Sequence, residues 1–128
     1  SSNVSVFPTE PEADPLDDWL TSLARIKGRV PDDVLVLPAH NDPFFGLHAR
    51  IDELIGLHES NLTRLLALIA APKRAVDVFE VLFKRQITQH ILSMATGESI
   101  AHLNCLIARG LATKEKDADG VDWYRAVG

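Results

Sequence analysis

The sequence contains a single cysteine, Cys105, among its 128 residues. A lone cysteine cannot form an internal disulfide, and such sparing use of cysteine is typical of a reducing compartment. Neither a long apolar run nor a charged-then-apolar leader is visible, so we expect a cytoplasmic protein with no membrane partner.

Positive charge is scarce in the first part of the chain. Residues 1–71 hold 5 Lys and Arg against 11 Asp and Glu, whereas residues 72–128 hold 8 against 7. A general polyanion binder needs an excess of cations on one face, and neither part has one. The composition therefore disfavours nucleic acid as a partner. The content of 46% hydrophobic residues is ordinary for a globular protein that buries a core.

The most informative stretch covers residues 33–46. Val34–Leu37 is a continuous apolar run closed by Pro38, which is typical of a strand buried on both faces. His40 follows the end of that run, where α/β sheets carry their ligand-binding loops, so it is a candidate metal ligand or acid/base group. The alternative is an ordinary loop histidine in a turn formed by Pro38, Asn41, Asp42 and Pro43.

The residues before this stretch predict a strand and a helix. Val4–Phe7 alternates like a short strand, and Asp14 followed by Pro15 is a typical helix start. Apolar residues then recur at helical spacing, which predicts an amphipathic helix over 15–27. Strand, helix and strand together make a βαβ unit, which needs further parallel strands beside it.

The residues after Gly46 predict a mostly helical arrangement. Apolar periodicity indicates helices over about 48–70, 74–83 and 88–109, the last continuing through Gly97 and ending at Gly110. An Asp-Gly turn at 119–120 between two strand-like runs predicts a C-terminal β-hairpin. Three helices followed by a hairpin make a winged-helix arrangement.

Three segments together carry a family resemblance, namely Val34-Leu35-Val36-Leu37-Pro38-Ala39-His40-Asn41, Leu47-His48-Ala49-Arg50-Ile51, and the helix with Ala101-His102-Leu103 and Ala108-Arg109-Gly110. The chain resembles the C-terminal portion of metallo-β-lactamase-fold hydrolases with an appended winged-helix-like domain. His40 matches the last metal-ligand histidine of that superfamily, while Ala39 and Asn41 stand where glycines are common. The HxHxDH motif of the superfamily is absent.

The resemblance implies an α+β protein in two parts. Residues 1–46 would be the C-terminal fragment of a metallo-β-lactamase-like domain, a partial αββα layer, and residues 47–128 a winged-helix-like accessory domain. It also implies two metal ions, usually zinc, and activated-water hydrolysis of an ester, thioester, lactone or phosphodiester of a small-molecule substrate. A catalytic zinc needs three or four protein ligands, so this fragment is expected to be inactive and to hold no metal tightly by itself.

Several other side chains admit two interpretations. Phe44 and Phe45 could wall a substrate pocket or pack against the long helix. His48, His58, His90 and His102 lack the spacing of a second metal site, and Glu98 with His102 is expected to form a solvent-side pair. Cys105 lies among apolar residues and is expected to be a buried small hydrophobe.

The alternative function is a stand-alone winged-helix domain that binds nucleic acid or mediates protein interaction and dimerisation. The cations for nucleic acid would be Arg109 on the last helix and Lys114 and Lys116 on the wing, with Glu98, His102 and Asn104 also on the exposed helix face. Acidic residues in the wing weaken that interpretation.

Overall fold

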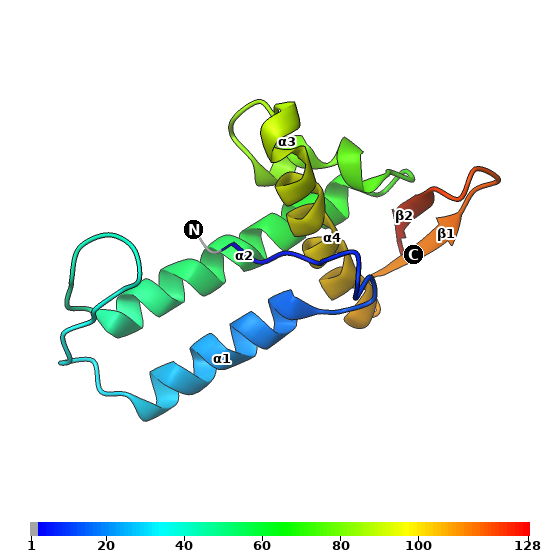
Figure 1. Cartoon of the computed structure of the whole chain (residues 1–128). Coiled ribbons are helices and arrows are strands. Elements are labelled where there is room, and N and C mark those ends of the chain that lie inside the picture. Colours follow the sequence, from blue (N-terminus) through cyan, green and yellow to red (C-terminus); the bar gives the residue numbers. More distant parts are fainter. Residues whose placement is uncertain (1–2) are drawn as a thin grey trace.

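The computed structural model describes residues 3–128 and is rich in helix (Figure 1). Two long helices, α1 and α2, contact each other, and α4 contacts both. The hairpin of β1 and β2 follows α4 at the far end of the molecule from the loop that joins α1 to α2 (Figure 1). The elements are α1 Pro15–Arg29, α2 Leu47–Leu68, η1 Ala75–Asp77, α3 Phe79–Leu82, η2 Gln89–Ile91, α4 Leu92–Ala108, β1 Ala112–Lys116 and β2 Asp122–Ala126.

The α1 helix confirms the prediction from its start signals. The Asp14 side chain accepts a hydrogen bond from the backbone N–H of Asp17 at 3.2 Å, and Pro15 occupies the first helical position. Leu16, Leu20 and Leu23 form its buried face. The helix runs two residues beyond the predicted end because Gly28 stays helical.

The α4 helix is the centre of the core. The six consecutive residues Ala101–Leu106 are all buried, so the helix is covered on every side along that length. It is continuous through Gly97, as predicted. At its end Gly110 adopts φ +75°, and the N–H of Leu111 donates to the carbonyl oxygen of Leu106 at 2.9 Å. This is the left-handed ending that the Gly110-Leu111 pair predicts.

The predicted hairpin is also confirmed. β1 and β2 pair antiparallel from Ala112 opposite Ala126 to Lys116 opposite Asp122. Lys73 makes a further antiparallel bridge with Tyr124, through two backbone hydrogen bonds of 2.9 and 2.7 Å. The segment between α2 and η1 therefore lies along the outer edge of β2.

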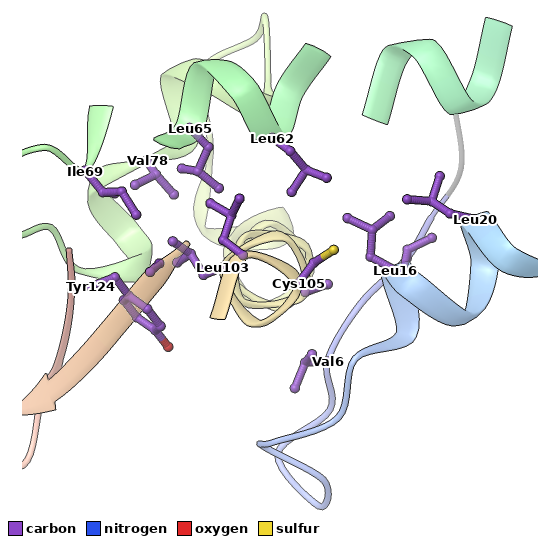
Figure 2. Packing of buried hydrophobic residues seen from close by; sticks show 14 residues of the cluster. Val6, Leu16, Leu20, Leu62, Leu65, Ile69, Val78, Leu103, Cys105 and Tyr124 are labelled. Carbon is purple, nitrogen blue, oxygen red and sulfur yellow. The ribbon is translucent and has the colours of Figure 1, made fainter. Parts of the chain in front are cut away.

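One core joins the parts of the chain (Figure 2). Leu103 of α4 lies among side chains from α2, while Leu16 and Leu20 of α1 approach the same helix from another side. Residues on both sides of position 46 thus contribute to one apolar cluster. The division into 1–46 and 47–128 stays a prediction, and its first two residues lie outside the described part of the chain.

Three predictions of secondary structure are wrong. Val4–Phe7 is not a strand: the Val6 N–H donates to the carbonyl oxygen of Gly97 at 3.0 Å, so the segment lies against α4, where Val4 and Val6 are buried. A Cβ added at Gly97 would stand 3.0 Å from the Val6 carbonyl oxygen, so this close approach suits glycine.

The predicted helix over 74–83 is instead η1 and the single turn of α3. It breaks because the Asp77 carboxylate accepts hydrogen bonds from the backbone and side chain of Arg74.

The third concerns Val34–Leu37. This run forms only an isolated bridge between Val36 and Phe44, and Leu35 and Leu37 are 52% and 75% exposed. A strand buried on both faces needs neighbouring strands, and residues 3–128 place none beside this run apart from the bridge to Phe44. The βαβ layer is therefore not formed within the described part of the chain.

The stretch Gln89–Ala108 is long and apolar enough, with a mean hydropathy of 1.2, to cross a membrane by length and composition. The prediction that the chain has no apolar run of membrane-spanning length is therefore wrong. Half of this stretch is buried inside the protein, as expected for the core helix of a globular protein, so it is weak evidence for a membrane span.

Candidate metal-ligand loop

The loop between α1 and α2 carries His40. It is closed by the antiparallel pair of Val36 and Phe44, whose two backbone hydrogen bonds are 2.8 and 3.1 Å long. His48 anchors its base, because its ring Nε2 lies 2.7 Å from the Val30 carbonyl oxygen and its backbone N–H donates to Asp32 at 2.9 Å. The bridge of Val36 to Phe44 and the contacts of His48 therefore hold a short exposed loop in place.

His40 lies in this loop, and its side chain is exposed. The next residue, Asn41, has φ +71°, a left-handed conformation that asparagine tolerates better than most residues. Asparagine thus takes a left-handed position where the resemblance implies glycine. A cavity of about 320 Å³ adjoins His40 and is lined by Pro38, His40, Asn41, Asp42, Phe44 and Arg50.

The donors near His40 do not form a complete metal site. No group of three or more His, Cys, Asp or Glu side chains that could hold a metal occurs within residues 3–128. A tetrahedral zinc site needs more ligands than one imidazole supplies. The accessible ring of His40 fits one ligand of a site, and the remaining ligands would have to come from other residues.

A pair of histidines that the sequence did not lead us to expect lies inside the protein. His58 of α2 and His102 of α4 are 3% and 4% exposed, and Nδ1 of His58 lies 3.4 Å from Nε2 of His102. Nδ1 of His102 lies 2.8 Å from the backbone carbonyl oxygen of Glu98. Since a carbonyl only accepts, His102 donates from Nδ1, and its Nε2 accepts from His58. Nε2 of His58 is then a buried acceptor without a hydrogen-bond partner in the part of the chain that the structure describes.

This pair of histidines corrects the expected solvent-side pair of Glu98 and His102. His102 faces α2 rather than solvent, and its ring contacts the Glu98 backbone rather than the carboxylate. Burial lowers the pKa of His102 to about 4 and also lowers the pKa of His58, while it raises the pKa of the Glu98 carboxyl. The signal was available, because His58 falls between Ile51 and Leu62 on the apolar face of α2.

One known protein family matches this chain over more than half of its length. The family model described as "Metallo-beta-lactamase-like, C-terminal domain" matches residues 62–127, which is more than half of the chain. The chain belongs to this metallo-beta-lactamase-like family. The resemblance to metallo-β-lactamase-fold proteins is thereby confirmed, while the assignment of His40 as a metal ligand stays a prediction.

Two solved structures are similar to this metallo-beta-lactamase-like chain. A beta-lactamase domain protein from Burkholderia ambifaria is 39% identical, with a TM-score of 0.94 over 99% of this chain. A metallo-beta-lactamase family protein from Thermus thermophilus is 29% identical, with a TM-score of 0.77 over 98% of this chain. In both cases the chain spans 38% of the other protein's length. No curated protein matches the chain.

The two candidate pocket residues of the metallo-beta-lactamase-like chain have different surroundings. Phe44 is half-buried and lines the cavity beside His40, whereas Phe45 is 70% exposed. Neither belongs to the apolar core cluster. Their role in a substrate pocket stays a prediction.

The cations of the nucleic-acid alternative are each paired with a carboxylate. Arg109 makes two hydrogen bonds to Glu59 of 2.8 and 2.7 Å, Lys114 lies 2.8 Å from Glu12, and Lys116 lies 3.0 Å from Asp122. The guanidinium of Arg109 holds the pKa of the Glu59 carboxyl below its usual range.

Two further residues of the expected exposed face are buried. Asn104 is 6% exposed, like the buried His102, and its side-chain amide donates to the carbonyl oxygens of Pro11 and Ala13, each at 2.9 Å. The assignment of His102 and Asn104 to an exposed face is therefore wrong. Cys105 is buried as predicted, and burial raises the pKa of its thiol to about 11.

Proposed function

We propose that this chain is the C-terminal part of a longer metal-dependent hydrolase in which His40 supplies one ligand of a dinuclear zinc site. The observation that carries the proposal is the exposed His40 on a loop fixed at Val36 and Phe44, in a chain that spans 38% of similar metallo-beta-lactamase proteins. Zinc would supply an activated water for hydrolysis of an ester, thioester, lactone or phosphodiester. The 128 residues alone would be inactive.

The exposed apolar side chains beside this loop support a longer protein. Leu35, Leu37 and Phe45 are 52%, 75% and 70% exposed and lie within eleven residues of one another along the chain. Apolar side chains gathered on one surface segment mark an interaction site. In the proposal, further strands of the αββα sandwich cover Leu35 and Leu37.

The same proposal makes residues 47–128 a winged-helix-like accessory domain. Its support is the order of α2, α3, α4 and hairpin, together with the bridge of Lys73 to Tyr124, which adds a short third strand at the edge of the wing. The α4 helix is buried among α1, α2 and the N-terminal segment, which favours an architectural or dimerisation role over insertion into a nucleic-acid groove. We further propose a cytoplasmic location, in line with the single buried Cys105.

The proposal is tested by the zinc content of the longer protein. With His40→Ala, zinc per chain measured by plasma mass spectrometry should fall from about two ions to about one, because one ligand is lost. His90→Ala is the matched control, since His90 is also an exposed histidine and lies in η2. Equal zinc content in the wild type and His40→Ala would refute the ligand assignment.

A further inference from the structure

A second cavity lies apart from the loop that carries His40. It has a volume of about 910 Å³ and is bounded by the N-terminal segment, η2, the first half of α4 and the hairpin. None of its lining residues belongs to the His40 loop. Its volume falls in the range of cavities that hold small molecules.

The walls of this cavity are largely apolar. Val6 and Phe7 form one side, and Leu92, Met94 and Ile100 of α4 form the other. Phe7, Leu92 and Met94 are 69%, 41% and 37% exposed, so apolar surface is available to a ligand. Burying such surface would favour an apolar ligand body.

Tyr124 of β2 supplies a polar anchor. It is 3% exposed, yet its side chain lines the cavity, and its hydroxyl makes no hydrogen bond to any residue of the described chain. Figure 2 shows the Tyr124 hydroxyl directed away from the labelled side chains of the core cluster. Burial raises the pKa of Tyr124 to about 12, so the hydroxyl is neutral and able to donate.

The charged groups at the rim leave no free charge. Lys114 lies 2.8 Å from Glu12, and Asp122 lies 3.0 Å from Lys116. Thr96 donates to the Leu92 carbonyl oxygen at 2.8 Å. A ligand would meet paired charges and several polar side chains, namely the Tyr124 hydroxyl and the side chains of Ser5, Gln89, His90 and Ser93, which matches a neutral molecule better than an ion.

The geometry points to a binding site for a small neutral amphipathic molecule between the N-terminal segment, α4 and the hairpin, with its apolar body on Phe7, Leu92 and Ile100 and a hydrogen-bond acceptor on the Tyr124 hydroxyl. This inference concerns a site separate from the proposed zinc ligand, and it does not depend on hydrolysis.

Nile red, a neutral dye with a carbonyl acceptor, tests the site by fluorescence titration of the full chain. We expect saturable 1:1 binding, about fivefold weaker for Tyr124→Phe, which keeps the ring and loses only the hydroxyl. Leu92→Ala should weaken binding several-fold by loss of apolar contact, roughly as expected for a truncated leucine. Leu57→Ala is the matched control, because Leu57 is 43% exposed on α2 and does not line the cavity.

Amide NMR shifts locate the dye independently of affinity. Shifts concentrated at Val6, Gly97 and Lys114 support the site. Non-saturable binding, affinities that both Tyr124→Phe and Leu92→Ala leave unchanged, or shifts concentrated at Leu35 and Leu37 would each overturn it.

Discussion

Lowering the pH from 7 to about 4.5 is expected to destabilise the chain strongly, through the buried pair of His58 and His102. The pKa of His102 is about 4 in the folded protein against 6.5 for an ordinary histidine, so the unfolded chain binds the proton more readily. Stability is therefore complete above about pH 6.5 and declines as the pH falls towards 4. A shift of this size corresponds to roughly 3 kcal/mol, and His58 acts in the same direction.

The measurement is urea unfolding at several pH values between 7.5 and 4.5. His102→Gln should be less stable at neutral pH but should show a shallower decline, because one titrating group is gone. His90→Gln, at an exposed position, should keep the wild-type slope. Carboxylates such as Glu59, whose pKa is lowered by Arg109, affect stability at more acidic pH. A wild-type slope retained in His102→Gln would show that another group controls acid unfolding.

Leu103→Ala is expected to lower the free energy of unfolding by about 2 to 5 kcal/mol. Leu103 is 0% exposed and belongs to the same buried cluster as Leu65, Ile69 and Tyr124 (Figure 2). Truncation removes apolar contacts within this cluster and leaves a cavity that the helix α4 cannot close easily. Denaturant unfolding at pH 7.5 measures the effect.

Leu57→Ala is the control for the core truncation, since Leu57 is a helical leucine that is 43% exposed. It should change the unfolding free energy by only about 0.5 kcal/mol. A similarly small effect of Leu103→Ala would mean that α4 is not the core helix, and would restore the interpretation of α4 as an exposed recognition helix.

Local signals in the sequence predict most of the helices and the hairpin. Asp14-Pro15 marks the start of α1, Gly110-Leu111 marks the end of α4, and Asp119-Gly120 marks the turn of the hairpin. Each signal depends on the chemistry of a few neighbouring residues, so the rest of the fold does not need to be known.

The two predicted N-terminal strands failed for a reason that local signals cannot reveal. A strand needs a partner, and Val4–Phe7 finds its hydrogen bond on α4, while Val34–Leu37 meets only Phe44 within residues 3–128. An apolar run records that a segment is suited to burial, but not which surface buries it.

The candidate site could be predicted only in part. The assignment of His40 rests on its place after Val34–Leu37 and on the family resemblance, and it stays a prediction, since no group of three possible metal ligands occurs within residues 3–128. The contact of His58 with His102 joins residues 44 positions apart, so it depends on how α2 and α4 pack. The spacing of Glu98 and His102 predicts that the two residues share a helix face, but it does not show whether that face is exposed or buried.

The intact mass of the native polypeptide in its source cells tests most directly whether this chain works within a longer hydrolase. Similar proteins are long enough that the chain spans 38% of them, so we predict a native mass more than twice the 14.1 kDa of these residues. A native mass near 14.1 kDa would leave His40 without further metal ligands and would contradict the proposed function.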